Sequence, residues 1–158
     1  MPIVRGIVNW AFTHRPDNYE HYTATLDVDD TFINVLRENK VKAQVKEIEH
    51  GKEKEAHDAD KNYQFKFISY ATKKDGSPNP APRVVDAKRN PLPDGLLIGN
   101  GSEVIVQYAL IPYDDSGTKR KRISLDAIQV LNLVPYASNQ KLEFGEEEGY
   151  SADEEGII

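Results

Sequence analysis

The amino-acid sequence predicts a mainly β protein, a small barrel or partly open sheet of about five strands with one α-helix packed on it. Two observations favour this class. Five segments alternate apolar and polar residues or are rich in β-branched and aromatic side chains, as strands are. A single segment, residues 29–36, has apolar residues at helical spacing behind capping residues. The chain of 158 residues has the length of one domain with appendages.

The strands and turns follow from local residue patterns. The first turn, Arg15-Pro-Asp-Asn18, is indicated because Pro fixes φ and Asp and Asn bond their own backbone. The sequence Asp114-Asp-Ser-Gly117 indicates a hairpin turn, since Gly tolerates a positive φ. The strands are expected in residues 2–12, 21–28, 63–70, 102–112 and 120–134.

One helix is expected after the second strand. Residues 29–31, Asp-Asp-Thr, offer N-caps, and the apolar residues within 32–36 share one face of a helix. The spacing of Val41, Val45 and Ile48 permits the helix to continue, so its end stays open.

A long Pro- and Gly-rich stretch separates the third and fourth main strands. Residues 75–101 hold nine of the 19 Pro and Gly residues, and within them only residues 83–86 have strand character. A loop of this length in a small domain is usually functional or disordered.

The charge is divided unevenly along the chain. The net charge is −6, from 20 Lys and Arg against 26 Asp and Glu. Residues 142–158 hold seven of the acids and no base, which leaves 20 bases against 19 acids in residues 1–141. The sequence therefore predicts a near-neutral domain over residues 1–141 and an acidic tail over residues 142–158.

Several classes of protein are excluded or disfavoured by composition. Without cysteine there is no disulfide framework, thiol nucleophile or cysteine-ligated metal site. The apolar runs are far shorter than the roughly 20 residues that cross a bilayer. The first residues, Met-Pro-Ile-Val-Arg-Gly, lack the pattern of a signal peptide. A soluble, intracellular protein without membrane partners is expected.

No catalytic, metal or cofactor site is expected. His14, Asp17, Glu20 and His21 are metal-ligand types, but a Pro-Asp turn separates the two imidazoles, so surface histidines in a turn are favoured. The Gly99-Asn-Gly101 sequence is followed by a strand and by no Lys-Ser or Lys-Thr pair, which favours a tight turn over a phosphate loop. A nuclease is a distant third possibility.

Cations interleaved with aromatic residues favour binding of a single nucleic-acid strand. Phosphates attract positive charge and unpaired bases stack on flat rings, each worth roughly 1–3 kcal/mol. Alternation places Arg120 and Arg122 on one face of their strand, and Lys66 and Tyr70 on the face opposite the core aromatics of residues 63–67. The alternative for residues 119–122 is a merely solvated hairpin, and for Trp10 a half-buried core position is favoured over a stacking role. The predicted DNA-binding residues are Trp10, Lys66, Tyr70, Arg83, Lys88, Arg89, Tyr113, Arg120 and Arg122.

The acidic tail combines negative charge with isolated large apolar residues. Such a segment cannot bury enough apolar surface to fold alone, so it is expected to be disordered. A tail that served solubility alone would not need its apolar residues, which favours docking on a basic patch of a partner or in the domain's own basic groove. The predicted docking residues are Phe144, Glu146, Glu147, Glu148, Tyr150, Asp153, Glu154, Glu155, Ile157 and Ile158.

An ordered set of segments resembles the single-stranded DNA-binding proteins that tailed phages encode for replication and recombination. The resemblance spans nearly the whole chain, acidic tail included. The matching segments are Phe12-Thr-His-Arg-Pro-Asp17, Tyr22-Thr-Ala-Thr-Leu26, Arg83-Val-Val-Asp-Ala-Lys88, Ile98-Gly-Asn-Gly-Ser-Glu-Val-Ile-Val106 and Ala127-Ile-Gln-Val-Leu-Asn-Leu-Val-Pro-Tyr136.

The resemblance implies an OB-fold barrel that coats single-stranded DNA without sequence preference in the host cytoplasm. It also implies a tail that recruits replication or recombination proteins and contributes to self-association, for example as a homodimer. The chain departs from many family tails, which end in an aromatic residue, because it ends in Ile157-Ile158. The competing interpretation is a protein-interaction or virion-accessory module that acts through the tail without binding DNA.

Overall fold

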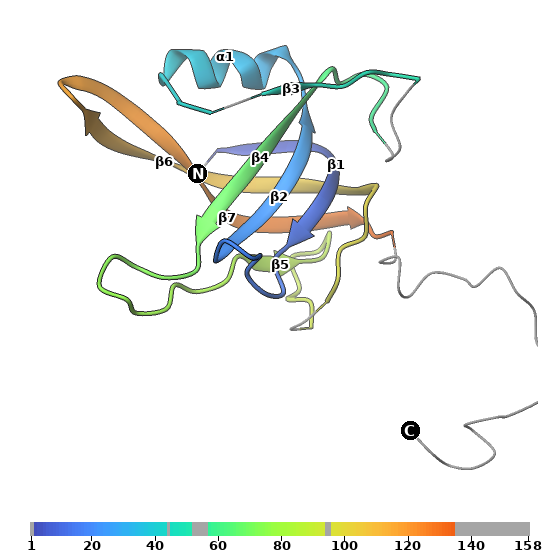
Figure 1. Cartoon of the computed structure of the whole chain (residues 1–158). Coiled ribbons are helices and arrows are strands. Elements are labelled where there is room, and N and C mark those ends of the chain that lie inside the picture. Colours follow the sequence, from blue (N-terminus) through green and yellow to red (C-terminus); the bar gives the residue numbers. More distant parts are fainter. Residues whose placement is uncertain (1, 44, 52–56, 94–95, 135–158) are drawn as a thin grey trace, which may run out of the picture.

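The computed structural model of the chain describes residues 2–43, 45–51, 57–93 and 96–134. These residues confirm the prediction of a mainly β protein with one helix (Figure 1). Besides the five expected strands they contain the short strand β5, at the residues with predicted strand character, and the unexpected short strand β3. The predicted tail residues lie outside the described part. The elements are β1 Ile3–Phe12, β2 His21–Val28, α1 Asp30–Glu38, β3 Lys46–Glu47, β4 Tyr63–Tyr70, β5 Arg83–Val85, β6 Ser102–Asp115 and β7 Thr118–Asn132.

All seven strands belong to one curled sheet with the order β3-β4-β2-β1-β6-β7-β5. The short strand β5 runs parallel to β7, and every other neighbouring pair is antiparallel. The curl brings β4 against β7, but no ladder of hydrogen bonds joins these two strands in the described residues. The architecture is therefore an OB-fold-like barrel that stays partly open, as OB-folds do, rather than a closed five-stranded one.

Aromatic rings fill the centre of the barrel. Phe65 and Phe67 point inward from β4, as the alternation of that strand predicts, and both are buried. Phe32 of α1 packs on them with ring centroids 5.2 and 5.5 Å away, and on Tyr108 of β6 at 5.6 Å. Helix α1 therefore lies against the sheet through its apolar stripe, and Figure 1 shows it across one end of the barrel.

Hydrogen bonds cap both ends of helix α1. Its N-cap is Asp29, whose carboxylate accepts the N–H of Phe32 at 3.2 Å. At the other end the N–H of Lys40 bonds the carbonyl of Arg37 (3.2 Å), and the N–H of Val41 bonds that of Leu36 (3.0 Å). This is the Schellman pattern, here with Lys40 rather than Gly at a φ of 53°. The apolar residues beyond it therefore do not extend the helix.

A buried carboxylate anchors the segment before β4. Asp27 of β2 is fully buried, and its carboxylate accepts the N–H of Asp58 at 2.9 Å and lies 3.0 Å from Nδ1 of His57. Burial raises the pKa of Asp27, and these two hydrogen bonds oppose that rise. The contact ties residues 57–62 to the middle of the sheet.

The stretch rich in Pro and Gly is organised as two turns in its described part. In the first, the N–H of Asn79 bonds the carbonyl of Ala71, so the chain folds back directly after β4. In the second, the carboxylate of Asp86 accepts the N–H groups of Lys88 and Asn90 at 2.8 and 2.9 Å. No helix within the described residues is long and apolar enough to span a membrane.

Candidate nucleic-acid interface

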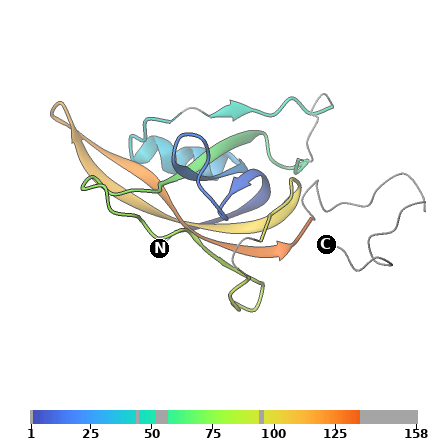
Figure 2. The ribbon, with the colours of Figure 1, turned by 60° about the horizontal axis from the view of Figure 1, so that its bottom comes forward.

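The longest feature of the sheet is the β6–β7 hairpin. Its strands pair out to Asp115 and Thr118, and its two turn residues, Ser116 and Gly117, both have positive φ values of 50° and 91°. Two successive positive φ values give a turn whose twist matches that of the strands. The tip therefore continues the strands and projects beyond the rest of the sheet (Figures 1 and 2).

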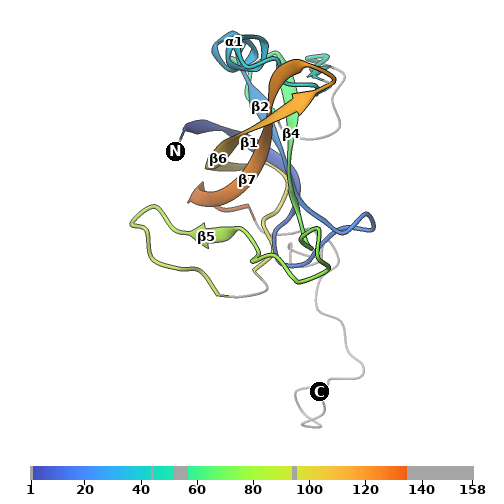
Figure 3. The same cartoon turned by 90° about the vertical axis from the view of Figure 1, so that its left-hand side faces the viewer.

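A groove lies where this hairpin meets β4. On β4, Lys66, Ile68 and Tyr70 alternate with the buried Phe65 and Phe67 and therefore share the outer face of the strand. Figure 3 shows β4 running down from the hairpin, with α1 on the same side as the hairpin. The groove has a volume of about 160 Å³, and the residues that line it are Val41, Lys42, Ala43, Phe65, Lys66, Ile68, Tyr70, Tyr113, Arg122 and Ile123.

The groove brings together four of the nine predicted DNA-binding residues: Lys66, Tyr70, Tyr113 and Arg122. Both tyrosines are well exposed, Tyr70 at 48% and Tyr113 at 37%. The guanidinium carbon of Arg122 lies 5.5 Å from the centre of the Tyr70 ring, and His21 meets the same ring in an edge contact at 5.0 Å. A cation stacked on a ring keeps N–H donors free at its edge. This arrangement offers cations and flat rings within one concavity.

Arg120 lies outside the groove lining, in contacts that attach the hairpin to the segment after α1. Its Nε donates to Asp115 at 3.1 Å, and its Nη1 donates to the carbonyl of Lys40 at 3.2 Å. Lys42 forms an ion pair with the same carboxylate. Lys42, together with the charge of Arg120, holds the pKa of Asp115 below its usual range. Alternation predicts that Arg120 and Arg122 share one face of β7. The register agrees, because their partners on β6, Tyr113 and Ile111, are also two residues apart and so share a face.

A second group of predicted residues lies near β5. Arg83 donates to Asp126 of β7 at 2.9 Å, and Arg89 sits in the Asp86 turn with a φ of 68°. Lys88 is exposed in the same turn. Strand β5 pairs with β7 at Ala127, which is five residues and so about 17 Å along the strand from Arg122. Arg83, Lys88 and Arg89 thus form a basic group apart from the groove.

Trp10 belongs to neither group. It lies in the irregular part of β1 between Asn9 and Phe12, with a φ of 54°, and its N–H donates to Oδ1 of Asn100 at 2.8 Å. Trp10 is 54% exposed, so it is about half-buried but is not one of the buried core residues, and its stacking role stays a prediction. Strand β2 separates β1 from β4 in the sheet.

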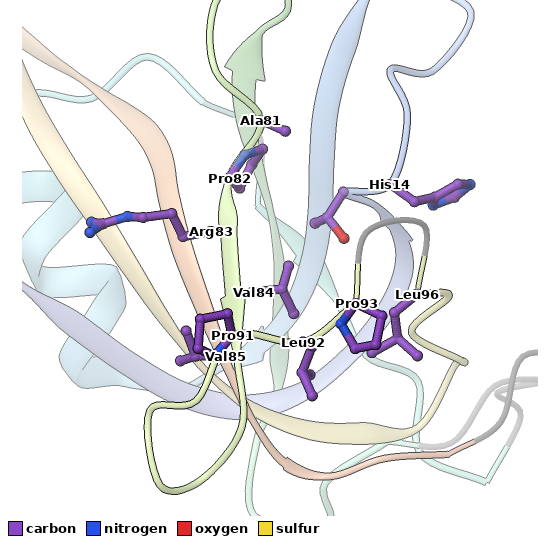
Figure 4. A pocket seen from close by; sticks show the side chains of 11 residues that line it. His14, Ala81, Pro82, Arg83, Val84, Val85, Pro91, Leu92, Pro93 and Leu96 are labelled. Atoms are coloured by element: carbon purple, nitrogen blue, oxygen red, sulfur yellow. The ribbon is translucent and has the colours of Figure 1, made fainter.

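A cavity lined mostly by apolar residues lies apart from the groove. It has a volume of about 520 Å³ and lies between the end of β1 and the chain on both sides of β5. Figure 4 shows the guanidinium of Arg83 directed away from Leu92, Pro93 and Leu96, which line the cavity. Its lining therefore offers little to a phosphate.

Some residues of the groove were not predicted from the sequence. Lys42 and Ala43 follow the helix cap, where the periodicity left the course of the chain open. Ile68 stands between Lys66 and Tyr70 on the same strand face, so alternation alone would have found it. No three His, Asp or Glu side chains gather to hold a metal ion in the part of the chain that the structure describes.

No family model matches the chain, and no curated protein matches it in sequence. Solved structures do match. The single-stranded DNA-binding protein gp2.5 of bacteriophage T7 is 17% identical with a TM-score of 0.55, and the match covers 94% of this chain and 99% of that one. The single-stranded DNA-binding protein of bacteriophage Enc34, in complex with single-stranded DNA, is 12% identical with a TM-score of 0.55, over 85% of this chain and 89% of that one.

The chain has the fold of these phage single-stranded DNA-binding proteins. A form of the Enc34 protein truncated at its C-terminus matches with 12% identity and a TM-score of 0.53, over 82% of this chain and 86% of that one. The resemblance seen in the sequence is thereby confirmed at the level of the fold. Identities this low establish a shared architecture and leave the function to be inferred from the groove.

Proposed function

We propose that the chain binds single-stranded DNA, without a required recognition sequence, along the groove between β4 and the β6–β7 hairpin. The observation that carries this proposal is the convergence of Lys66, Arg122, Tyr70 and Tyr113 on one concavity. In OB-folds, oligonucleotides bind the face of the second and third strands and the loop between the fourth and fifth. Among the five long strands of this chain these are β2, β4 and the β6–β7 turn.

The role of each groove residue in DNA binding follows from the chemistry of its side chain. Lys66 and Arg122 donate to phosphates, while Tyr113 and Tyr70 offer ring faces to unpaired bases. A duplex keeps its bases stacked inside, so it can use the cations but not the rings. Arg83, Lys88 and Arg89 extend the basic track along β7, Arg120 adds charge beside the groove, and Trp10 offers another ring; these four cations and the indole are secondary contacts in this proposal.

The biological role proposed is the coating of phage DNA during replication or recombination in the host cytoplasm, without catalysis. The fold shared with two phage single-stranded DNA-binding proteins, one of them described with single-stranded DNA bound, supports this role. Homodimer formation is part of the same proposal.

Titration of full-length protein against a labelled single strand and a duplex of equal length tests the proposal. We expect at least tenfold tighter binding to the single strand, because only that form can stack on the tyrosines. The logarithm of affinity should fall with the logarithm of salt concentration by about 0.7 per phosphate neutralised. Equal binding to both DNAs, or binding that ignores salt, would contradict the proposal.

The acidic tail is proposed to dock on replication or recombination proteins and to compete with DNA for the basic groove. Residues 142–158 carry seven negative charges and four large apolar or aromatic positions besides Leu142: Phe144, Tyr150, Ile157 and Ile158. This composition complements a groove that offers both cations and aromatic rings.

A chain that ends at residue 141 tests the tail. Removing seven negative charges and the competitor should raise affinity for single-stranded DNA several-fold, most clearly at low salt, where charge is least screened. The matched control is a full-length chain with the same acids replaced by Gln, which removes the charge and keeps the apolar residues. Weaker DNA binding by the shortened chain would rule out competition. If neither form binds DNA, the protein-interaction module is the better description.

A further inference from the structure

We infer that the groove is a pocket for one thymine base, whose methyl group rests on an apolar floor. This inference rests on the proposed function and assigns a base preference to the same site. Besides its cations and tyrosines, the groove is lined by the aliphatic side chains of Val41, Ala43, Ile68 and Ile123. Contact with phosphate and sugar alone would require no such floor, since the backbone of DNA is polar and charged.

The floor is fixed by three separate elements. Ile68 is held on the outer face of β4 by strand alternation. Ile123 adjoins Arg122 in β7 and is 9% exposed, so it is seated in the core with one edge at the groove. Val41 is placed by the helix cap, where its N–H bonds the carbonyl of Leu36 at 3.0 Å. Because each backbone position is set without DNA, the pocket is preformed and ordering it costs little on binding.

The rim selects among pyrimidines by hydrogen-bond polarity. Lys66 and Arg122 each carry several N–H donors and no acceptor, so a side chain that bonds a phosphate can also donate to a base carbonyl. Thymine presents carbonyl acceptors and a C5 methyl group, whereas cytosine presents an amino donor at the position of the thymine O4. The cationic donors of Lys66 and Arg122 over an aliphatic floor therefore match both the carbonyls and the methyl group of thymine, but only the carbonyls of uracil.

The sharpest test compares homopolymers that differ only in the methyl group. Full-length protein is titrated with fluorescently labelled oligo-dT and with oligo-dU of the same length and deoxyribose backbone. One buried methyl group contributes about fourfold in affinity, so oligo-dT should bind to each protein molecule about fourfold more tightly than oligo-dU does. A comparison with oligo-dA would not serve, since adenine strands stack on themselves before they bind.

A variant locates the effect in the floor. Val41→Thr keeps the side-chain shape but exchanges a methyl for a hydroxyl, so the ratio of dT to dU affinity should fall towards one. Val41 is only partly buried, which lets the variant fold. Val85→Thr makes the same exchange in β5, outside the groove, and should keep the fourfold ratio.

Three outcomes overturn the inference. Equal affinity for oligo-dT and oligo-dU shows that the floor does not hold a methyl group, while binding to both leaves the proposed function intact. A fourfold preference that survives Val41→Thr places the methyl contact elsewhere. Absence of binding to every oligonucleotide overturns the thymine pocket together with the proposed function.

Discussion

Replacing Lys66 and Arg122 together with alanine is expected to lower affinity for single-stranded DNA about 100-fold at low salt. Each residue contributes a charge-assisted hydrogen bond to a phosphate, worth about 1.5 kcal/mol at the low end of the range for charged groups. The low end is appropriate because the groove is open to water. Arg122 also lies over the Tyr70 ring, so its loss weakens the stacking platform as well.

The salt dependence gives an independent measure of the same substitution. The slope of log affinity against log salt should become shallower by about 1.4, because two cations no longer displace counterions from the single strand. The matched control, Arg5→Ala with Arg37→Ala, removes two cations that do not line the groove: Arg5 pairs with Glu103 on β6, and Arg37 is exposed on α1. An equal loss in the control would show that only net charge matters and that the groove is not the site.

Local patterns sufficed to predict the five long strands. In β4 the aromatic Tyr63, Phe65 and Phe67 alternate with the polar Gln64 and Lys66, so Phe65 and Phe67 point inward whatever the neighbouring strands are. Asp29 was expected as a cap because it precedes the apolar stripe of α1, and its carboxylate does bond Phe32. Such features depend on neighbours in sequence, which a sequence displays directly.

The groove could be predicted only in part, since its wall comes from segments that are far apart in sequence. Alternation gives the face of Lys66 and Tyr70 but not the strand that covers it. The contact of Arg122 with Tyr70 arises because the curl of the sheet brings β7 to β4, which are not neighbours in the sheet. The role of Val41 depended on where α1 ends, and a Lys in the left-handed position of the cap gives a weaker sequence signal than Gly.

Arg120 illustrates a second limit of sequence interpretation. Alternation places it with Arg122, and the register agrees, yet its hydrogen bonds go to Asp115 and to the carbonyl of Lys40. Which of two neighbouring cations is already engaged depends on the side chains that the fold brings near. Because Asp115 binds Arg120, that residue attaches the hairpin to the segment after α1, whereas Arg122 faces the groove.

Replacing Gly6 with alanine is expected to destabilise the whole domain by about 3 kcal/mol or more. A Cβ atom at this position would stand 2.2 Å from the carbonyl oxygen of Asp27 and 3.2 Å from Cγ of Leu26. The nearer atom belongs to the backbone of β2 and cannot rotate away, so β1 must separate from β2 or leave its pairing of Gly6 with Val104 on β6. Overpacking that requires such a backbone shift costs about 1–3 kcal/mol or more.

Urea unfolding followed by circular dichroism measures this cost, with Gly76→Ala as the control. Gly76 has a φ of 86°, and no atom lies within 4 Å of the point where its Cβ would stand, so alanine there pays only for the left-handed backbone, about 1–2 kcal/mol. Both substitutions add one methyl group, but only Gly6→Ala places it against another strand, so a larger loss of stability for Gly6→Ala reports the close approach of β1 to β2. A Gly6→Ala protein that unfolds at the wild-type urea concentration would show that the two strands lie farther apart than the structure places them.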